Sequence, residues 1–388
     1  AAWFLKNQLD ELHDKSGINK IKSLTRYILQ SVVMVTITCS DRVSAMNVRL
    51  DLNTTGLDLS LADLVKSSLI SRLDSRKHDQ FISTWRDIEY IAESNDESVS
   101  DLLTYYAYYL LASKPRRSLP EELERKFKKK NSNTVAHNFK VFAEHYDTIL
   151  NTKSKMIYSL RNLPDRVFWK TILIAAKREG FSRFKQLCKK LRNLYYSYWI
   201  AGYTTAKTRN FSFKLIRLIK EGKFLSEITK EIEEALEEDG VSEYAKDNLE
   251  GDCYGETWLK PLLILIEYEQ TDELVFIEYS RHLHVDHILP EKWKKKRYWR
   301  RRWTDEEADE LLHTLGNLTL LSGKKNIQAS NEDFPKKKKI YKGKGLDGKT
   351  SFQISQRILR KSEWTAKEVR KRQRWLTRQT KNILGLSL

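Results

Sequence analysis

The chain has 388 residues, 40% of them hydrophobic, and a formal net charge of +18. This length exceeds what one hydrophobic core usually serves, so we expect two or three domains. Three scattered cysteines without a CxxC pair exclude a disulfide framework and a zinc knuckle, and they indicate a reducing, cytoplasmic compartment. No apolar run reaches the 18 residues of a membrane span.

The first 115 residues predict a helical domain. Leu61, Leu64 and Leu69 belong to an apolar stripe with helical spacing, and Ser60 precedes it as a cap with Asp63 three residues later. The segment SVVMVTIT (31–38) fits either a buried strand or a buried helix. The chain opens without Met in a helix-like pattern, and we expect a further N-terminal portion to precede it.

Residues 116–280 predict a helical middle domain. The stretch KPRRSLPEELERKFKKKNSN (114–133) has two prolines and a charge run, which are typical of a boundary. The aromatic group YYSYW (195–199) could stack on bases or pack inside a helical core, and we favour packing.

The last 108 residues carry most of the positive charge. They hold 28 Lys and Arg against 12 Asp and Glu, which is the electrostatic footprint of a nucleic-acid binder. Two basic runs, 294–302 and 335–349, predict phosphate contacts without sequence preference. The residues expected to contact DNA are Lys294, Lys295, Lys296, Arg297, Arg300, Arg301, Arg302, Lys336, Lys337, Lys338 and Lys339.

The stretch HVDHILPEKW (284–293) places Asp286 beside His287. It predicts a short strand that enters a loop at Pro290. A turn and a second strand follow in LGNLTLL (315–321), and a helix follows in KKNIQASNEDF (324–334). Neighbours on a strand point to opposite faces, so Asp286 and His287 can serve one site only where the strand breaks.

This combination of residue types suits phosphodiester hydrolysis. Such a reaction needs a base for the attacking water and a divalent cation on the scissile phosphate. A neutral imidazole suits the base near pH 7. A carboxylate and an amide oxygen suit Mg²⁺ or Mn²⁺.

The series HVDHILP, LGNLTLL and KKNIQASN resembles the ββα-metal motif of HNH (His-Me finger) endonucleases. More narrowly, it is similar to the nuclease domain of GmrSD-type modification-dependent restriction enzymes, the SspE/BrxU-like group. The resemblance implies that Asp286 and Asn326 bind the metal and that His287 is the general base. It implies that Asn317 braces the loop holding that base. Accessory positions without a firm role are His284, His313, Asn331 and Lys336, and Asn331 is the main alternative to Asn326 as a metal ligand.

A second resemblance lies in LDLNTTGLDLSLADLVKSSLI (50–70), which is similar to a stretch in the regulatory half of the same enzymes. It implies a ParB-like domain and NTP dependence, although the Asp-Gly-Gln-Gln-Arg-type motif of that domain is missing. Turn and cap chemistry is the alternative reading of Asn53, Gly56 and Ser60. Analogy with the family suggests a homodimer. The expected domains are a regulatory part (1–115), a helical middle (116–280) and a basic nuclease domain (281–388).

The expected fold is mainly α, with a C-terminal ββα nuclease domain embedded in helices. A last amphipathic helix would start with a capping box of Thr365 and Glu368, and Trp364 or Trp375 would anchor it. The expected function is metal-dependent cleavage of modified or foreign DNA in anti-phage defence. Two alternatives stay open: a catalytically silent nucleic-acid-binding regulator, and an RNA-cleaving toxin.

Overall fold

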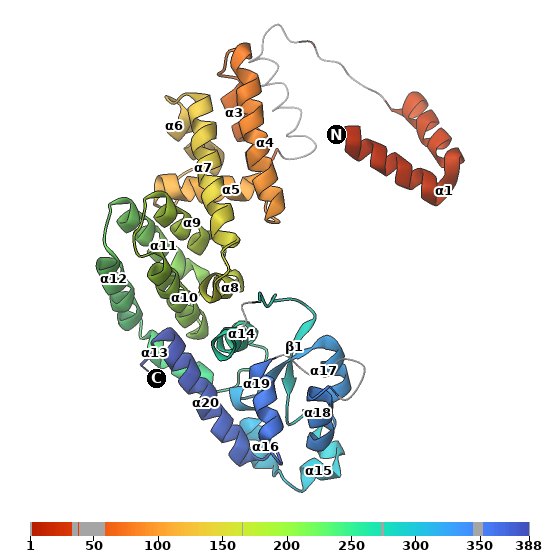
Figure 1. The fold of residues 1–388 in the computed structure, drawn as a ribbon, viewed down its shortest axis with the longest axis vertical. Helices are drawn as coiled ribbons and strands as arrows, with labels where there is room; N and C mark the ends of the chain where they lie inside the picture. Colours follow the sequence, from red (N-terminus) through yellow and green to blue (C-terminus); the bar gives the residue numbers. More distant parts are fainter. Residues whose placement is uncertain are drawn as a thin grey trace. The chain divides into compact units, whose positions relative to one another are not determined.

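The protein is seen here as a computed structural model. The described residues are 2–32, 38, 59–164, 166–272, 275–343 and 352–387. Within them the chain is mainly helical and contains a two-stranded sheet (Figure 1). The prediction of a mainly helical fold is confirmed. The chain separates into two compact units, residues 1–59 and 60–388. The predicted domain boundaries near residues 115 and 280 stay predictions.

The first unit contains α1 (Ala2–Ser31), which Gly17 breaks into two helical stretches. Gly17 has a φ of 70°, a conformation that glycine adopts without steric cost because it lacks a Cβ atom. Most of the SVVMVTIT segment, together with Asn53 and Gly56, lies outside the described residues.

The second unit begins with a succession of helices. Its first helix follows the predicted cap, because the Ser60 hydroxyl accepts a hydrogen bond from the Asp63 amide at 3.2 Å. The elements in order are α3 (Leu61–Ile70), η1 (Ser75–Lys77), α4 (His78–Ser94), α5 (Val99–Leu111), α6 (Leu119–Phe127), α7 (Ser132–Leu150), α8 (Lys155–Arg161), α9 (Val167–Arg178), α10 (Phe184–Ile200), α11 (Thr205–Lys220), α12 (Leu225–Glu238), α13 (Val241–Glu250) and α14 (Leu259–Gln270).

The aromatic group on α10 belongs to the helical core. Tyr196 and Tyr198 are almost completely buried, and each hydroxyl has a partner. Tyr196 donates to the Ser159 carbonyl at 3.0 Å, and Tyr198 donates to the Asp239 carboxylate at 2.7 Å. Buried rings cannot stack on a base, so the prediction that these residues pack is confirmed.

The C-terminal part contains the sheet and shorter helices. Strand β1 pairs antiparallel with β2, and α17 follows β2 directly, so the predicted order of strand, strand and helix is confirmed. The elements are β1 (Leu283–His287), η2 (Trp293–Lys295), α15 (Arg297–Arg300), α16 (Asp305–Leu311), η3 (Leu315–Asn317), β2 (Leu318–Ser322), α17 (Gly323–Ala329), α18 (Phe334–Tyr341), α19 (Gln353–Gln356), η4 (Arg357–Arg360) and α20 (Ala366–Leu384).

Strand β2 contributes to two hydrophobic cores. Leu318 and Leu320 pack with the helical core of the preceding helices, whereas Leu321 packs in a second core with Trp299 and Trp364. Successive strand residues point to opposite faces, so the sheet lies between these cores. The prediction that Trp364 anchors the last helix agrees with its burial.

Helix α20 runs along the C-terminal part and also reaches α10, α13 and α14 (Figure 1). It approaches η3 so closely that a Cβ atom on Gly316 would lie 2.5 Å from the Val369 carbonyl. The predicted capping box at its start is wrong, because Thr365 makes no side-chain cap bond. Glu368 instead contacts Lys361 and Lys371, at 2.5 and 3.1 Å.

Among the described residues, none of the helices combines the length and apolar character needed to cross a membrane.

The buried thiol of Cys188 on α10 yields a first prediction. Burial raises the pKa of Cys188 from 9.0 to about 12, so the folded state keeps a proton that the unfolded state loses above pH 9. Stability should therefore fall by roughly 1.4 kcal/mol per pH unit between these values. We expect the Cys188→Ala variant to show a shallower alkaline loss of stability than wild type in urea titrations. Parallel curves for the two proteins would contradict this.

Candidate functional site

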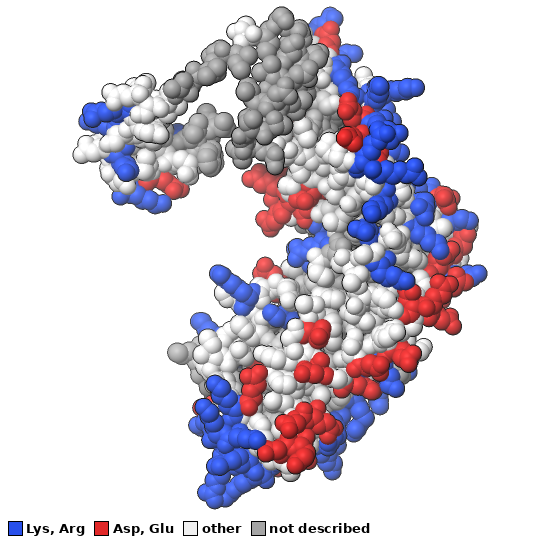
Figure 2. All heavy atoms as spheres, turned by 180° about the vertical axis from the view of Figure 1, so that it is seen from behind, with Lys and Arg blue, Asp and Glu red and all other residues white. Residues whose placement is uncertain are grey.

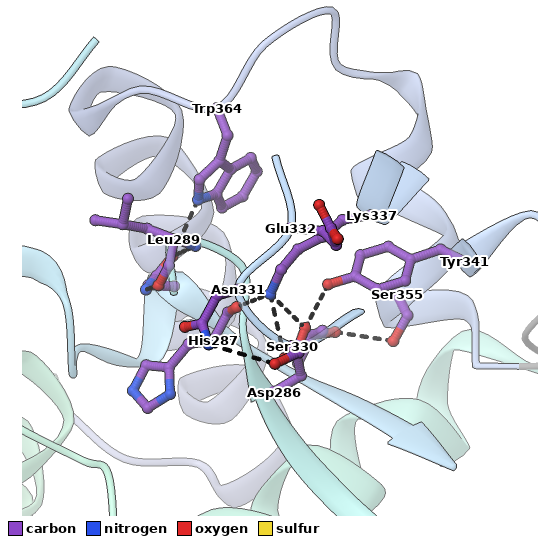
Figure 3. Close-up of polar contacts among 12 residues, drawn as sticks. Asp286, His287, Leu289, Ser330, Asn331, Glu332, Lys337, Tyr341, Ser355 and Trp364 are labelled. Carbon is purple, nitrogen blue, oxygen red and sulfur yellow. Dashed lines mark hydrogen bonds and ion pairs between the residues drawn. The ribbon is translucent and has the colours of Figure 1, made fainter. Parts of the chain in front are cut away.

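The site is built around the end of β1. In the sheet, Asp286 faces Thr319 and His287 faces Leu318 across the strand pair. The strand runs through both residues and ends at His287, before the loop that was predicted at Pro290. Figure 3 shows the His287 ring pointing away from the Asp286 carboxylate. The two side chains therefore open onto different surroundings.

The segment after His287 is held by the side chain of Asn317, which is fully buried. The Asn317 amide oxygen accepts from the Leu289 amide at 2.8 Å, and its amide nitrogen donates to the Leu289 carbonyl at 3.0 Å. The same nitrogen donates to Leu312, and the Trp364 indole donates to the same oxygen at 3.0 Å. Both ends of the amide are thus satisfied, and they fix the chain that leaves the strand.

The Asp286 carboxylate lies in a buried cluster with two residues of α18 (Figure 3). The Lys337 ammonium lies 3.3 and 3.2 Å from its two oxygens, and Tyr341 donates to one of them at 2.5 Å. Lys337 also donates to the His287 carbonyl. Burial raises the pKa of Asp286 and lowers the pKa of Lys337, while their mutual attraction opposes both changes.

The His287 ring lies on the other side, against His313 and Tyr254. His287 Nε2 and His313 Nδ1 are 3.0 Å apart, and the Tyr254 ring centroid is 4.1 Å from that of His287. Burial, together with the nearby His313 and Lys337, lowers the pKa of His287 to about 3. The imidazole is therefore neutral at pH 7 and retains one nitrogen that can accept a proton.

The partners of His287 come from two distant segments. The Cys253 amide donates to the His313 carbonyl at 3.0 Å, and Asp252 forms an isolated bridge with Thr314. These backbone contacts bring Tyr254, which lies between α13 and α14, to the end of β1.

Two sets of residues are candidate ligands for a divalent metal. The predicted pair is Asp286 and Asn326, and the Lys337 ammonium already occupies a cationic position at the carboxylate. In the described part of the chain, His287, Glu291 and His313 form a second set, with ligand atoms within 4.8 Å of one another. Two imidazoles and a carboxylate suit a transition metal such as zinc or manganese. Glu291 is exposed, so an ion can reach this second set.

The remaining predicted residues lie around the two clusters. Asn326 is half-buried on α17, and its side chain has no hydrogen-bonding partner among the described residues. Asn331 donates to the neighbouring Ser330 hydroxyl at 3.3 Å. The His284 ring packs close to Gly323 at the start of α17. Lys336 points outward and pairs with Glu332.

Sequence reasoning missed Lys337 as a partner of Asp286. Phe334, Lys337 and Tyr341 occupy one buried face of α18 with spacings of three and four residues. A lysine on an otherwise apolar stripe is a signal that could have been found, because buried lysines need an anionic partner. The prediction that Lys337 contacts DNA is wrong in this structure, since its side chain is 0% exposed.

The first basic run lies on the surface around α15. Figure 2 shows Lys and Arg gathered over this end of the unit. Lys295, Arg297, Arg300 and Arg301 are exposed. Three other members of the run pair with acidic groups: Lys294 with Asp305, Lys296 with Glu332, and Arg302 with Glu363.

The aromatic residues inside that run are placed for packing. Trp299 is fully buried, and its indole donates to the Glu332 carbonyl at 3.1 Å. The Arg302 guanidinium lies 3.9 Å from the Tyr298 ring centroid. In the second run, Lys338 donates to the Lys361 carbonyl, and Lys339 is exposed.

The comparison with protein families now gives the decisive observation. Residues 239–379 match the family described as GmrSD restriction endonucleases, C-terminal domain. This part of the chain is similar to a restriction endonuclease domain, a class of nuclease. The match begins upstream of β1 and includes Tyr254, both strands and most of α20. The comparison with curated proteins gives no significant match.

The buried pair of Asp286 and Lys337 yields a second prediction. The Lys337→Met variant leaves the Asp286 carboxylate without its cation, and we expect a loss of about 3–5 kcal/mol of unfolding free energy in urea titrations. The double variant with Asp286→Asn should recover part of that loss, because no buried charge then remains unpaired.

A matched control is available on the same helix. Lys336→Met removes the neighbouring ammonium, which is 58% exposed and pairs only at the surface. Its effect should stay below about 1 kcal/mol. Equal losses of unfolding free energy in the Lys336 and Lys337 variants would show that the buried pair contributes no more to stability than the exposed one.

Proposed function

We propose that this protein is a divalent-metal-dependent DNA endonuclease of the HNH type, with His287 as its general base. The observation that carries the proposal is the family match over residues 239–379, which contains a strand, strand and helix arrangement with a neutral imidazole at its centre. The same match favours an endonuclease over a silent DNA-binding regulator or an RNA-cleaving toxin.

The surroundings of His287 leave it with a nitrogen lone pair that can accept a proton from water. Its low pKa keeps the ring neutral at pH 7. Donation from His287 Nε2 to His313 Nδ1 would select the tautomer in which His287 Nδ1 carries the lone pair. Asn317 holds the following segment at Leu289, which limits movement of the base. A base held in this way can accept a proton from a water positioned for in-line attack.

We propose Asp286 and Asn326 as the ligands of Mg²⁺ or Mn²⁺, following the family resemblance. A bound divalent cation would neutralise charge on the scissile phosphate and the leaving oxygen. Lys337 contacts both Asp286 oxygens, so it competes with a metal ion for the carboxylate. The ammonium would have to leave or share the carboxylate when the cation binds.

The exposed basic residues near α15 would hold the DNA backbone without reading its sequence. We further propose that the substrate is modified or foreign DNA and that the protein acts in cytoplasmic anti-phage defence. NTP dependence and a homodimeric state are part of the same proposal, and family resemblance alone supports them.

A third prediction concerns the base. Supercoiled plasmid cleavage with Mg²⁺ or Mn²⁺ should fall by about 10²–10⁴-fold in the His287→Ala variant, because the attacking water loses its proton acceptor. His284→Ala is the matched control, since it removes an imidazole from the same strand, and it should retain activity. Unchanged cleavage by the His287 variant would refute the assignment. Cleavage of RNA but not DNA would favour the toxin.

A fourth prediction separates the two metal sets. Mn²⁺ binding, measured by calorimetry, should weaken about tenfold or more in Asn326→Ala, whereas Glu291→Gln should bind like wild type. Both side chains are accessible, so neither change disturbs the core. The reverse pattern would assign the cation to His287, Glu291 and His313. It would also exclude His287 as a free base while the metal is bound.

A further inference from the structure

A cavity lies between η4 and α20. Its volume is about 170 Å³, well above the roughly 10–15 Å³ needed for one water molecule. It opens toward solvent, so a ligand can enter it. Its lining residues are Arg357, Ile358, Lys361, Trp364, Glu368, Lys371, Arg372 and Trp375.

The cavity is strongly cationic. Four of its lining side chains carry positive charge, and Glu368 is its only acidic lining residue. Glu368 contacts Lys361 at 2.5 Å and Lys371 at 3.1 Å, so one carboxylate is shared between two ammonium groups. Arg357 and Arg372 have no carboxylate partner within the described residues. An anion would relieve the repulsion among these cations.

Arg372 provides an independent observation. Arg372 is 8% exposed. Its terminal guanidinium nitrogens donate hydrogen bonds to backbone carbonyls, including Gly316 at 3.1 Å and Leu318 at 2.6 Å. Its Nε atom has no hydrogen-bonding partner in the described part of the chain. Burial lowers the pKa of Arg372 to about 9, with Tyr341 opposing the change and Arg357 adding to it. A buried guanidinium without a counter-charge is costly.

The part of the cavity lined by Arg357 and Trp375 suits a phosphorylated ligand rather than a simple halide ion. The Arg357 guanidinium lies over the Trp375 ring, 4.4 Å from its centroid, and is exposed at the mouth of the cavity. Guanidinium groups bind phosphate oxygens in pairs and also stack on planar rings. Arg357, held against Trp375, therefore offers donors for a phosphate and the outer face of its planar guanidinium for an attached base.

We infer that this cavity binds a phosphate group carried by a nucleotide, with Arg357 and Lys371 as its accessible contacts and Arg372 at its base. The nucleotide is either free in solution or part of a DNA strand, since both present the same phosphate chemistry. This inference does not depend on cleavage activity at His287.

The same cavity is connected to the segment that follows His287. Arg372 donates to carbonyls of η3 and its flanks, and Trp364 donates to the Asn317 amide oxygen. Gln373 accepts a hydrogen bond from the Gly316 amide at 2.5 Å. A bound phosphate that neutralises Arg372 should therefore stabilise η3 and, through Asn317, the chain after the strand.

The test compares two double variants of equal charge. Arg357→Gln with Lys371→Gln alters the cavity, and Arg360→Gln with Arg378→Gln removes two exposed charges from the same elements outside it. Arg372 is left intact because its carbonyl contacts support the fold. Binding of AMP and of a short single-stranded DNA is measured by calorimetry on the full chain.

The cavity variant should lose about tenfold or more in affinity for at least one probe, whereas the control variant should lose much less. Loss with AMP identifies a free nucleotide as the source of the phosphate, and loss with DNA alone identifies a strand. The bound probe should also slow amide exchange over residues 312–320 in wild type. Equal losses in both variants, or no binding of either probe, would overturn the inference.

Discussion

The amide of Asn317 is the constraint on which the candidate site depends. One buried side chain satisfies donors and acceptors from three segments, namely the loop after β1, the end of the preceding helical turn, and Trp364 before α20. An amide is suited to this because it offers donors and an acceptor at fixed positions. If one partner moves, a buried polar group is left unpaired, so the three segments keep their arrangement together.

Next to Asn317, two adjacent residues of β1 lie in different electrostatic environments. Asp286 faces a dry cluster whose positive charge comes from Lys337, whereas His287 faces a partly aromatic wall of Tyr254 and His313. The alternation of side chains along a strand produces this separation directly. Lys337 is near both, because it contacts the Asp286 carboxylate and the His287 carbonyl. Any movement of Lys337 would therefore change the environment of the carboxylate and the neutral imidazole together.

The sequence predicted local features well and long-range pairings poorly. The Ser60 cap, the helical core around Tyr196 and the order of β1, β2 and α17 follow from short-range patterns of charge and hydrophobicity. The contacts of Asn317 were expected in outline only through resemblance to known nucleases. The approach of Tyr254 to His287 depends on backbone bonds between segments about 60 residues apart, and no periodicity encodes such a contact. The Glu368 cap failed because two lysines compete for its carboxylate.

The backbone hydrogen bond between Cys253 and His313 bears on whether the C-terminal segment can be separated from the preceding helices. The basic C-terminal segment carries the motif, but Tyr254 reaches it from before α14, and α20 returns to place Gln373 against the Leu249 carbonyl. Arg192 on α10 similarly donates to the Ile383 carbonyl. A fragment that begins at residue 281 would thus expose the surface that packs against the preceding helices in the full chain. Recombination that transfers this C-terminal unit to another protein would have to carry the preceding helices with it.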